Sequence, residues 1–370
     1  MNNQLLEILA CPGCHGHLEL SVDRGTMDQI SIGSLACRPC RKEYAIKDDI
    51  PYFCPGADQD GGVKNQKRTY SAWWDLYHGE QSIIDQANIG AFHESLKISP
   101  QDIEGRAVLD AGCGNGRFSY VMSHYNPQLL VAFDLSSGLT HAKKAIAKHN
   151  PGSNMAYVQG DITRPPFSPN AFDIVISWGV ITHTPNARRT FGALSALVNK
   201  NGAIGIYVYE FHPLYKSDRH WLSLIAYVRS LFLVKPLRYL CSRLPTRLTH
   251  WFFMPIYYVE RFFNFGIVGC HGFPRDPWNK DRYFRTAIDR FKTRYTSEHQ
   301  FEEIVEWFAE NGYAQMKLGG YPRLSLTGTK NSESSPGTLN LTITHNAGQQ
   351  TKQTPQNQNA AELSLSGSAS

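Results

Sequence analysis

The stretch from Val108 to Arg117, VLDAGCGNGR, decides the fold of this chain. Its apolar start predicts a buried strand, and the glycines that follow Asp110 predict a turn that opens a helix. Glycine at such a turn lets a ligand approach bare backbone, as in nucleotide-binding loops. A dinucleotide fingerprint would need a small residue at Arg117, and the carboxylate of Asp110 would repel a pyrophosphate at the helix start. The loop therefore predicts a small cationic ligand.

Strand and helix patterns alternate after this loop. Such alternation calls for a parallel sheet with helices on both of its faces. We therefore predict an α/β fold with a doubly wound, seven-stranded, mostly parallel sheet that ends in a helix and two closing strands. The strands expected after the first one are residues 129–133, 157–162, 171–177, 197–208, 316–318 and 324–327.

A second acid lies in register with the glycine loop. Residues 129–133 predict the second strand, and Asp134 follows it directly. A carboxylate at this place accepts hydrogen bonds from both hydroxyls of a ribose. The alternative for an isolated acid after a strand is the N-cap of the next helix. Its register with the glycines favours the ligand role.

These features resemble the class I S-adenosylmethionine-dependent methyltransferases of the small-molecule, quinone-biosynthesis type, which have a Rossmann-like fold, over about residues 108–326. S-adenosylmethionine has an ammonium, a sulfonium and no phosphate, which suits an acid beside the glycine loop. The resemblance implies that Asp110 and Gly112 face the methionine end of this co-substrate, Asp134 the ribose and Asp161 the adenine. A turn residue is the alternative for Asp161. The other cofactor-binding residues that it implies are Gly114, Gly116, Leu135, Ile162 and Ser177.

The exit of the fourth strand bears on the methyl acceptor. Methyltransferases of planar amide or base nitrogens often have Asn or Asp-Pro-Pro-aromatic there, whereas this chain has SWGV at residues 177–180. Residues 180–186, VITHTPN, resemble enzymes that act on small molecules, including quinone and lipid-like substrates. The resemblance places His183 at the mouth of the site, where imidazole can take a proton as a general base. A hydrogen bond within the loop is the alternative. We expect methyl transfer to an oxygen or carbon of a small, apolar or aromatic metabolite.

Four of the eight cysteines form two C-x-x-C pairs. Cys11 and Cys14 are separated from Cys37 and Cys40 by about the length of a β-hairpin, and strand-like runs follow both pairs. This spacing predicts a zinc ribbon with a tetrahedral thiolate site. Four cysteines fill the coordination sphere, so the predicted zinc is structural. A redox pair would instead begin a helix in a βαβ unit.

The N-terminal segment also resembles a known protein. Residues 5–12, LLEILACP, the Gly-x-Leu-x-Leu pattern at 16–20 and DIPYF at 49–53 resemble the small zinc-ribbon subunit that activates RNA and protein methyltransferases in trans. Here the ribbon would lie in cis, where it either stabilises or gates the catalytic domain or only packs on it. The resemblance supplies the alternative function, an RNA or protein methyltransferase that uses the fused ribbon as its activator.

A long insert, residues 211–297, separates the fifth strand from the last helix. Helical spacing at 221–232 and 237–244 predicts amphipathic helices, and basic and aromatic side chains recur along it. Three interpretations remain open: a lid over an apolar substrate, contact of residues 211–265 with a membrane surface, and a nucleic-acid surface. Ligands bind outside the carboxyl ends of strands in doubly wound sheets, which favours the lid.

The composition limits the partners and the cellular location that we expect for this protein. The formal net charge of +5 over 370 residues does not by itself indicate a nucleic-acid partner. The apolar runs are too short to span a bilayer, so we expect a cytoplasmic protein and leave contact with a membrane surface open. Residues 330–370 predict a disordered polar tail, in which only 339–343 alternate as a short strand would.

The expected divisions are a ribbon at 1–56, a linker and lid helices at 57–99, the cofactor-binding core at 100–210, the cap insert at 211–297, the rest of the core at 298–329 and the tail at 330–370.

Overall fold

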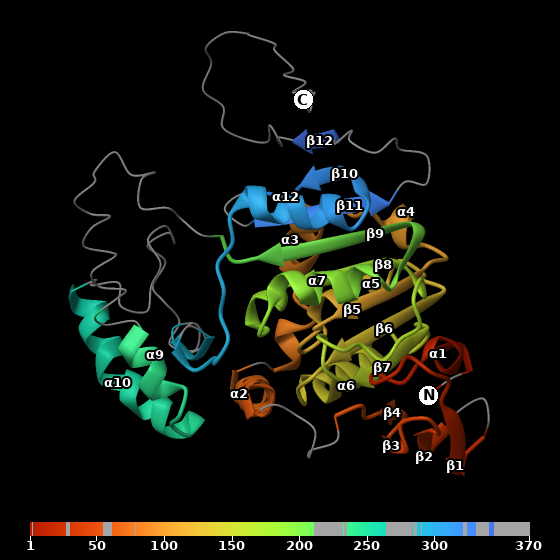
Figure 1. Ribbon diagram of the computed structural model, residues 1–370. Coiled ribbons are helices and arrows are strands. Elements are labelled where there is room, and N and C mark those ends of the chain that lie inside the picture. The colour runs from red at the N-terminus through yellow and green to blue at the C-terminus, as the bar shows by residue number, and fades with distance from the viewer. Residues whose placement is uncertain are drawn as a thin grey trace.

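An eight-stranded sheet and a smaller four-stranded sheet organise the computed structural model (Figure 1). The large sheet has the strand order β12-β10-β11-β9-β8-β5-β6-β7. Its strands are β5 (Ala107–Ala111), β6 (Leu129–Asp134), β7 (Met155–Gln159), β8 (Phe172–Trp178), β9 (Val198–Val208), β10 (Tyr313–Leu318), β11 (Leu324–Lys330) and β12 (Asn340–Ile343). The structure describes residues 1, 3–26, 30–54, 61–77, 79–210, 232, 235–263, 283, 287–289, 291–320, 324–330 and 340–343.

The seven strands expected from the sequence are present, and β12 adds an eighth at one edge. The strands β5 to β9 pair in parallel, whereas β11 is antiparallel to both β9 and β10. β12 pairs in parallel with β10 and occupies the place where the alternation at 339–343 predicts a strand. The doubly wound, mostly parallel α/β sheet is therefore confirmed. Lys330, predicted as the start of the tail, instead ends β11, where its Nζ donates to two carbonyl oxygens, and the other residues of the predicted tail, apart from β12, lie outside the described residues.

The strand order creates a switch point beside β5. The chain passes from β5 to β6 and β7 on one side, and β8 and β9 lie on the other side of β5. Asp110 pairs in register with Ala132 of β6 and Ile176 of β8. Ligands bind beyond the carboxyl ends of the strands at such a point. The glycine loop at 112–116 emerges there.

Helices cover both faces of this sheet because alternate strand residues point to opposite sides. Val108 packs in one cluster with Phe92 and Phe118 of two helices, whereas Leu109 belongs to a second cluster with Phe191 and Trp307. Figure 1 shows the sheet between these layers. The helices are α1 (Asn3–Ile8), α3 (Ala87–Leu96), α4 (Pro100–Ile103), α5 (Arg117–Ser123), α6 (Gly138–His149), α7 (Ala187–Ser195) and α12 (Phe301–Glu310).

The small sheet lies at the β7 edge of the large one. Phe53 N–H donates to the carbonyl oxygen of Gln159 at 2.7 Å, and Ala10 N–H donates to that of Pro166 at 2.9 Å. One hydrophobic cluster includes Leu35 of the small sheet and Phe133 of the large one. The N-terminal module thus shares its core with the sheet it packs on. Its strands are β1 (Glu19–Gly25), β2 (Ile30–Cys37), β3 (Lys42–Lys47) and β4 (Ile50–Pro51).

Helix α2 (Gly61–Tyr77) and two helices of the insert, α9 (Lys235–Cys241) and α10 (Thr246–Phe263), lie beyond the carboxyl ends of the strands (Figure 1). Phe253 and Tyr257 of α10 pack with Cys241 and Phe291 in a separate small core. The helix predicted at 221–232 falls almost wholly outside the described residues. Among the described residues, no helix has both the length and the hydrophobicity needed to cross a bilayer.

Candidate active site and zinc centre

Three glycines after β5 adopt backbone conformations that other residues rarely take. Gly112, Gly114 and Gly116 have φ values of 87°, 59° and 84°, which lie in the left-handed region that favours glycine. A Cβ on Gly112 would lie 2.4 Å from Val180, and a Cβ on Gly116 would lie 2.4 Å from Ala142. Gly116 is also the N-cap of α5. The sequence of strand, glycine turn and helix is confirmed.

Asp110 is the acid beside this turn, and only 3% of its surface is exposed. The hydroxyl of Ser119 donates a 2.6 Å hydrogen bond to its Oδ2 atom. Burial raises the pKa of Asp110 to about 7, and the charge of Asp134 adds to the rise, while the bond from Ser119 opposes it. A buried carboxylate beside a second carboxylate is stabilised by a cation. The electrostatics therefore agree with the predicted cationic ligand.

Asp134 accepts three hydrogen bonds, one of them from the glycine turn. Its Oδ2 atom accepts from the N–H of Gly114 at 2.8 Å, and its Oδ1 atom accepts from the N–H and the hydroxyl of Ser136 at 2.7 and 2.6 Å. Burial raises the pKa of Asp134, and these bonds oppose the rise. Ser137, not Asp134, is the N-cap of α6. The proposed contact of Asp134 with a ribose stays a prediction.

The remaining predicted cofactor residues follow or end other strands of the same sheet. Asp161 follows β7, and its Oδ1 atom accepts from the N–H two residues further on at 2.9 Å, as in an Asx turn. Ser177 donates to the carbonyl oxygen of Ala111 at 2.9 Å, so it joins the ends of β8 and β5. Leu135 is half-buried and Ile162 is buried. Their roles in cofactor binding stay predictions.

Helix α2 covers the glycine turn. A Cβ on Gly114 would lie 2.3 Å from Cζ2 of Trp74, and a Cβ on Gly138 would lie 2.7 Å from Cδ1 of the same ring. The N–H of Ser137 donates to the hydroxyl of Ser71 at 3.0 Å. The aromatic stretch at 70–74 therefore lies where a lid over the glycine turn would lie.

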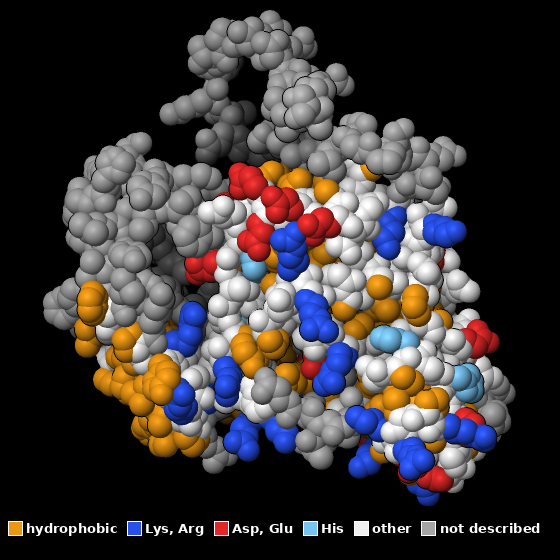
Figure 2. Space-filling view, viewed as in Figure 1, with side chains coloured by type: hydrophobic (Ala, Val, Ile, Leu, Met, Phe, Trp, Pro, Cys, Tyr) orange, Lys and Arg blue, Asp and Glu red, His pale blue; other side chains and the backbone are white. Residues whose placement is uncertain are grey.

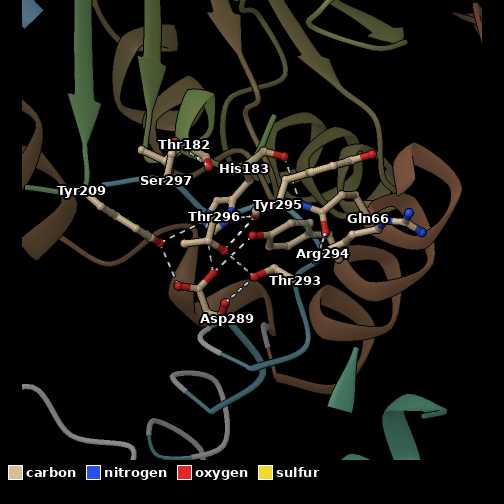
Figure 3. A network of polar contacts seen from close by, with 11 residues as sticks. Gln66, Thr182, His183, Tyr209, Asp289, Thr293, Arg294, Tyr295, Thr296 and Ser297 are labelled. Atoms are coloured by element: carbon tan, nitrogen blue, oxygen red, sulfur yellow. Dashed lines mark hydrogen bonds and ion pairs between the residues drawn. The ribbon is translucent and has the colours of Figure 1, made fainter. Parts of the chain in front are cut away.

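His183 is buried at the centre of a partly buried polar network (Figure 3). It ends the short helix η2 (Ile181–His183), and its Nδ1 atom lies 3.1 Å from the carbonyl oxygen of Tyr295. Its Nε2 atom lies 3.1 Å from the hydroxyl of Tyr209 and 3.5 Å from Oδ1 of Asp289. The Tyr209 hydroxyl donates to Oδ2 of Asp289 at 2.7 Å. A carbonyl oxygen only accepts, so Nδ1 holds a hydrogen and Nε2 faces the Tyr209 and Asp289 side.

Two residues of α2, Tyr70 and Gln66, join this network, and Figure 3 labels Gln66. The Tyr70 hydroxyl donates to Oδ1 of Asp289 at 3.2 Å, and burial followed by the charge of Asp289 raises the pKa of Tyr70 well above its usual value. The side-chain amide of Gln66 donates to the carbonyl oxygen of His183 at 3.0 Å and accepts from the N–H of Arg294 at 3.1 Å. The helix that covers the glycine turn thus also contacts the His183 network.

The sequence alone identified His183 but not its partners. Tyr209 lies just past β9, and its hydroxyl reaches His183 only because the strand carries it to the same rim. Asp289 lies in the insert, where no periodic pattern marked it. The alternative role of His183 was a hydrogen bond within its own loop. Its ring nitrogens instead contact Tyr295 and Tyr209, which lie in two distant segments.

The four predicted zinc ligands come together. The Sγ atoms of Cys11, Cys14, Cys37 and Cys40 all lie within 4.8 Å of one another. The sulfurs of Cys11 and Cys40 are 3.8 Å apart, and those of Cys14 and Cys37 are 3.5 Å apart. Tetrahedral zinc with bonds of about 2.3 Å needs sulfur separations of roughly 3.8 Å. The cluster fits a structural zinc ion whose four ligands leave no position open for a substrate.

Two protein families match this chain. Residues 108–202 match the family model described as "Methyltransferase domain", and residues 2–49 match the one described as "Trm112p-like protein". Residues 108–202 are thus similar to a methyltransferase domain, and residues 2–49, which contain the four-cysteine cluster, are similar to Trm112p-like proteins. Both resemblances inferred from the sequence are confirmed.

The curated relatives are methyltransferases and related transferases with different acceptors. A tRNA U34 carboxymethyltransferase from Campylobacter curvus is 28% identical over 103 residues, which cover 28% of this chain and 34% of the relative. A sterol 24-C-methyltransferase from Schizosaccharomyces pombe is 26% identical over 147 residues, 39% of this chain and 37% of the relative. A ubiquinone biosynthesis O-methyltransferase from Vibrio atlanticus is 25% identical over 175 residues, 47% of this chain and 70% of the relative. The chain spans only about a third of the length of the first two relatives.

Proposed function

We propose that the protein transfers the methyl group of S-adenosylmethionine to an oxygen or carbon of a small, apolar or aromatic metabolite. The supporting observation is the network of buried His183 with half-buried Tyr209 and Asp289, which α2 connects to the glycine turn. A network of this kind offers an acceptor both aromatic contacts and a group that takes its proton. We expect a cytoplasmic location, because a four-thiolate zinc site needs reduced cysteines.

The glycine turn suits S-adenosylmethionine in charge and shape. This co-substrate supplies a methyl group already activated on a sulfonium. In the proposal, Asp110 and Gly112 bind its cationic methionine end, Asp134 its ribose and Asp161 its adenine. Trp74 covers the turn, so α2 shifts when the ligand enters. These roles rest on charge, burial and position at the rim of the sheet.

In this proposal His183 receives the proton of the acceptor. The carbonyl oxygen of Tyr295 keeps a hydrogen on Nδ1, so Nε2 is the atom that exchanges a proton. The charge of Asp289 stabilises the imidazolium that results. The single hydroxyl hydrogen of Tyr209 goes either to Nε2 of neutral His183 or to Asp289, and in the second case the Tyr209 oxygen accepts from protonated Nε2. A hydroxyl or carbon acid placed beside Nε2 would lose its proton as it attacks the methyl group.

A second candidate function is supported by the N-terminal domain. A Trm112p-like match and tRNA U34 carboxymethyltransferase relatives favour an RNA acceptor, or a protein one, with the ribbon as activator in cis. The ribbon extends the β7 edge of the catalytic sheet and shares its core, so it supports the catalytic domain under either function. We rank the small-molecule acceptor first because the His183 network is buried beneath α2.

The experiment that tests the proposal identifies the molecule that gains a labelled methyl group. Purified full-length protein is incubated with cell extract and methyl-labelled S-adenosylmethionine, and products are separated by mass spectrometry. A labelled small apolar or aromatic compound supports the first proposal, whereas label in RNA or protein supports the second. Filter binding of bulk tRNA at two salt concentrations adds an independent check, because phosphate contacts weaken steeply as salt rises.

A further inference from the structure

We infer that an exposed apolar face on α9 and α10 docks the protein on the surface of an anionic phospholipid bilayer. Six side chains define this face, and each is at least 44% exposed. Hydrophobic side chains gather over these two helices in Figure 2, and Lys and Arg side chains lie on the surface beside them. The six residues are Tyr239, Leu240, Leu248, Trp251, Tyr258 and Val259.

The exposed side chains of α10 occupy one side of the helix. Leu248, Trp251 and Tyr258 are 53%, 70% and 51% exposed, and their spacing of three and seven residues places them in one stripe. Phe253 and Tyr257 lie on the other side, where they are 1% and 6% exposed and form the small core of the insert. Among the residues that the structure describes, α10 therefore packs through its inner side and leaves the outer stripe exposed. A large apolar area that a protein leaves exposed marks a contact site.

The charges around this face favour an anionic partner. Residues 235–259 include four Lys or Arg and no Asp or Glu. The guanidinium of Arg243 lies 3.5 Å from the centre of the Tyr239 ring, so a cation lies directly beside the apolar face. Lys64 and Arg68 of α2 are also exposed, and Asn65 between them donates to the carbonyl oxygen of Ser242 at 3.1 Å. Basic side chains from α2 and from the turn between α9 and α10 thus lie beside the face.

The chemistry of the face fits a bilayer surface better than a protein groove. Trp and Tyr are amphipathic and favour the headgroup region, Leu and Val favour the acyl boundary, and the neighbouring Lys and Arg attract anionic headgroups. A helix that is apolar on one outer side lies flat in the interface, which agrees with the absence of a bilayer-spanning helix among the described residues. The docked helices are connected to the candidate active site, because α2 contacts both Ser242, directly after α9, and His183.

Vesicle flotation with the full-length, zinc-loaded protein tests this inference. The expected result is binding to vesicles of phosphatidylcholine mixed with phosphatidylglycerol, with a partition coefficient about tenfold above that for phosphatidylcholine alone, since a few basic residues suffice for such a preference. The double variant Leu248→Ser, Trp251→Ser should lose about tenfold or more of the binding to the mixed vesicles. Ile32→Ser, Ile89→Ser is the matched control, because both residues are 39% exposed and lie outside the face; it should bind as the wild type does.

Three results would overturn the inference: no flotation with mixed vesicles, equal loss in the control, or a wild-type dimer that dissociates in the Leu248→Ser, Trp251→Ser variant. Light scattering during gel filtration measures the dimer. Thermal unfolding confirms that the variants are folded, which we expect because the altered side chains are exposed. Calorimetry with S-adenosylmethionine is run in parallel, so failure of membrane docking and failure of the proposed methyl transfer remain distinguishable.

Discussion

The ring of Trp74 lies against the bare backbone of Gly114. A Cβ on Gly114 would approach Cζ2 of Trp74 to 2.3 Å, and the N–H of the same glycine donates to Asp134 at 2.8 Å. One residue of the turn thus contacts both the covering helix α2 and the acid that follows β6. The contact with Trp74 leaves no room for a side chain at this position.

Substitution of Gly114 should therefore affect ligand binding and not only stability. Gly114→Ala puts a Cβ into the Trp74 ring and forces alanine to φ 59°. We expect the affinity for S-adenosylmethionine, measured by calorimetry, to fall at least about tenfold. Gly105→Ala is the matched control, since Gly105 has φ 67° and open space where the Cβ would lie. It should cost about 1 kcal/mol of stability and leave the affinity unchanged. Equal affinities in both variants would contradict the assignment of the turn.

Asp134→Ala should weaken cofactor binding. The substitution removes the acceptor that holds Gly114 and Ser136, and charge-assisted hydrogen bonds contribute roughly 1.5–3 kcal/mol each. We expect the dissociation constant for S-adenosylmethionine to rise about tenfold to a hundredfold. The measurement is calorimetry on the folded variant, with the demethylated product as a second ligand. Unchanged affinity for both ligands would contradict the proposed role of Asp134 in cofactor binding.

Asp110 should make the stability of the protein depend on pH. Its folded-state pKa is raised to about 7 from the ordinary 3.8 by burial, so the folded state holds the proton more tightly than the unfolded chain. The resulting stabilisation is fully present below about pH 4 and is lost as the pH rises through 7. Asp110→Asn stays neutral, so the free energy of unfolding from urea titrations should fall less between these pH values than in the wild type. Identical pH profiles would contradict the burial of this charge.

Tyr209→Phe should separate catalysis from cofactor binding. The variant keeps the ring but loses the hydroxyl that lies between His183 and Asp289. We expect kcat for the acceptor found by mass spectrometry to fall about tenfold to a hundredfold, because proton transfer typically contributes a hundredfold or more. The affinity for S-adenosylmethionine should stay within twofold or so of the wild type, since Tyr209 lies outside the predicted cofactor residues. An unchanged kcat and pH profile would show that the network takes no part in proton transfer from the acceptor.

Removal of zinc should destabilise the catalytic domain as well as the ribbon. Leu35 of the ribbon and Phe133 of the catalytic sheet belong to one core, and structural zinc sites supply about 10 kcal/mol or more to the folding of their modules. We expect one zinc per chain by elemental analysis, and a lower unfolding temperature for Cys40→Ser or after chelation. Cys54→Ser is the control, because Cys54 lies outside the four-cysteine cluster. A catalytic domain that unfolds at the same temperature without zinc would contradict the shared core.

Short-range features of the sequence determined the strands, the glycine turn and the metal site of this protein. The glycines and Asp110 define a turn by their own backbone preferences and charge, the alternating apolar runs define strands, and two C-x-x-C pairs define a metal site through spacing alone. Each of these signals lies within a few residues or within one hairpin. For that reason the sheet, the glycine turn and the cysteine cluster could be predicted without coordinates.

Contacts between distant segments were decided only by the tertiary structure. Tyr70 and Asp289 are 219 positions apart, and His183 and Tyr295 are 112 apart, so no periodicity in the sequence relates them. The sheet brings these segments to one rim, where α2 covers them and burial raises the pKa of Tyr70. The sequence by itself therefore determined the type of fold and the presence of the glycine turn. Which groups surround His183, and how the ribbon joins the sheet, depended on packing, because long-range contacts form only when the whole core assembles.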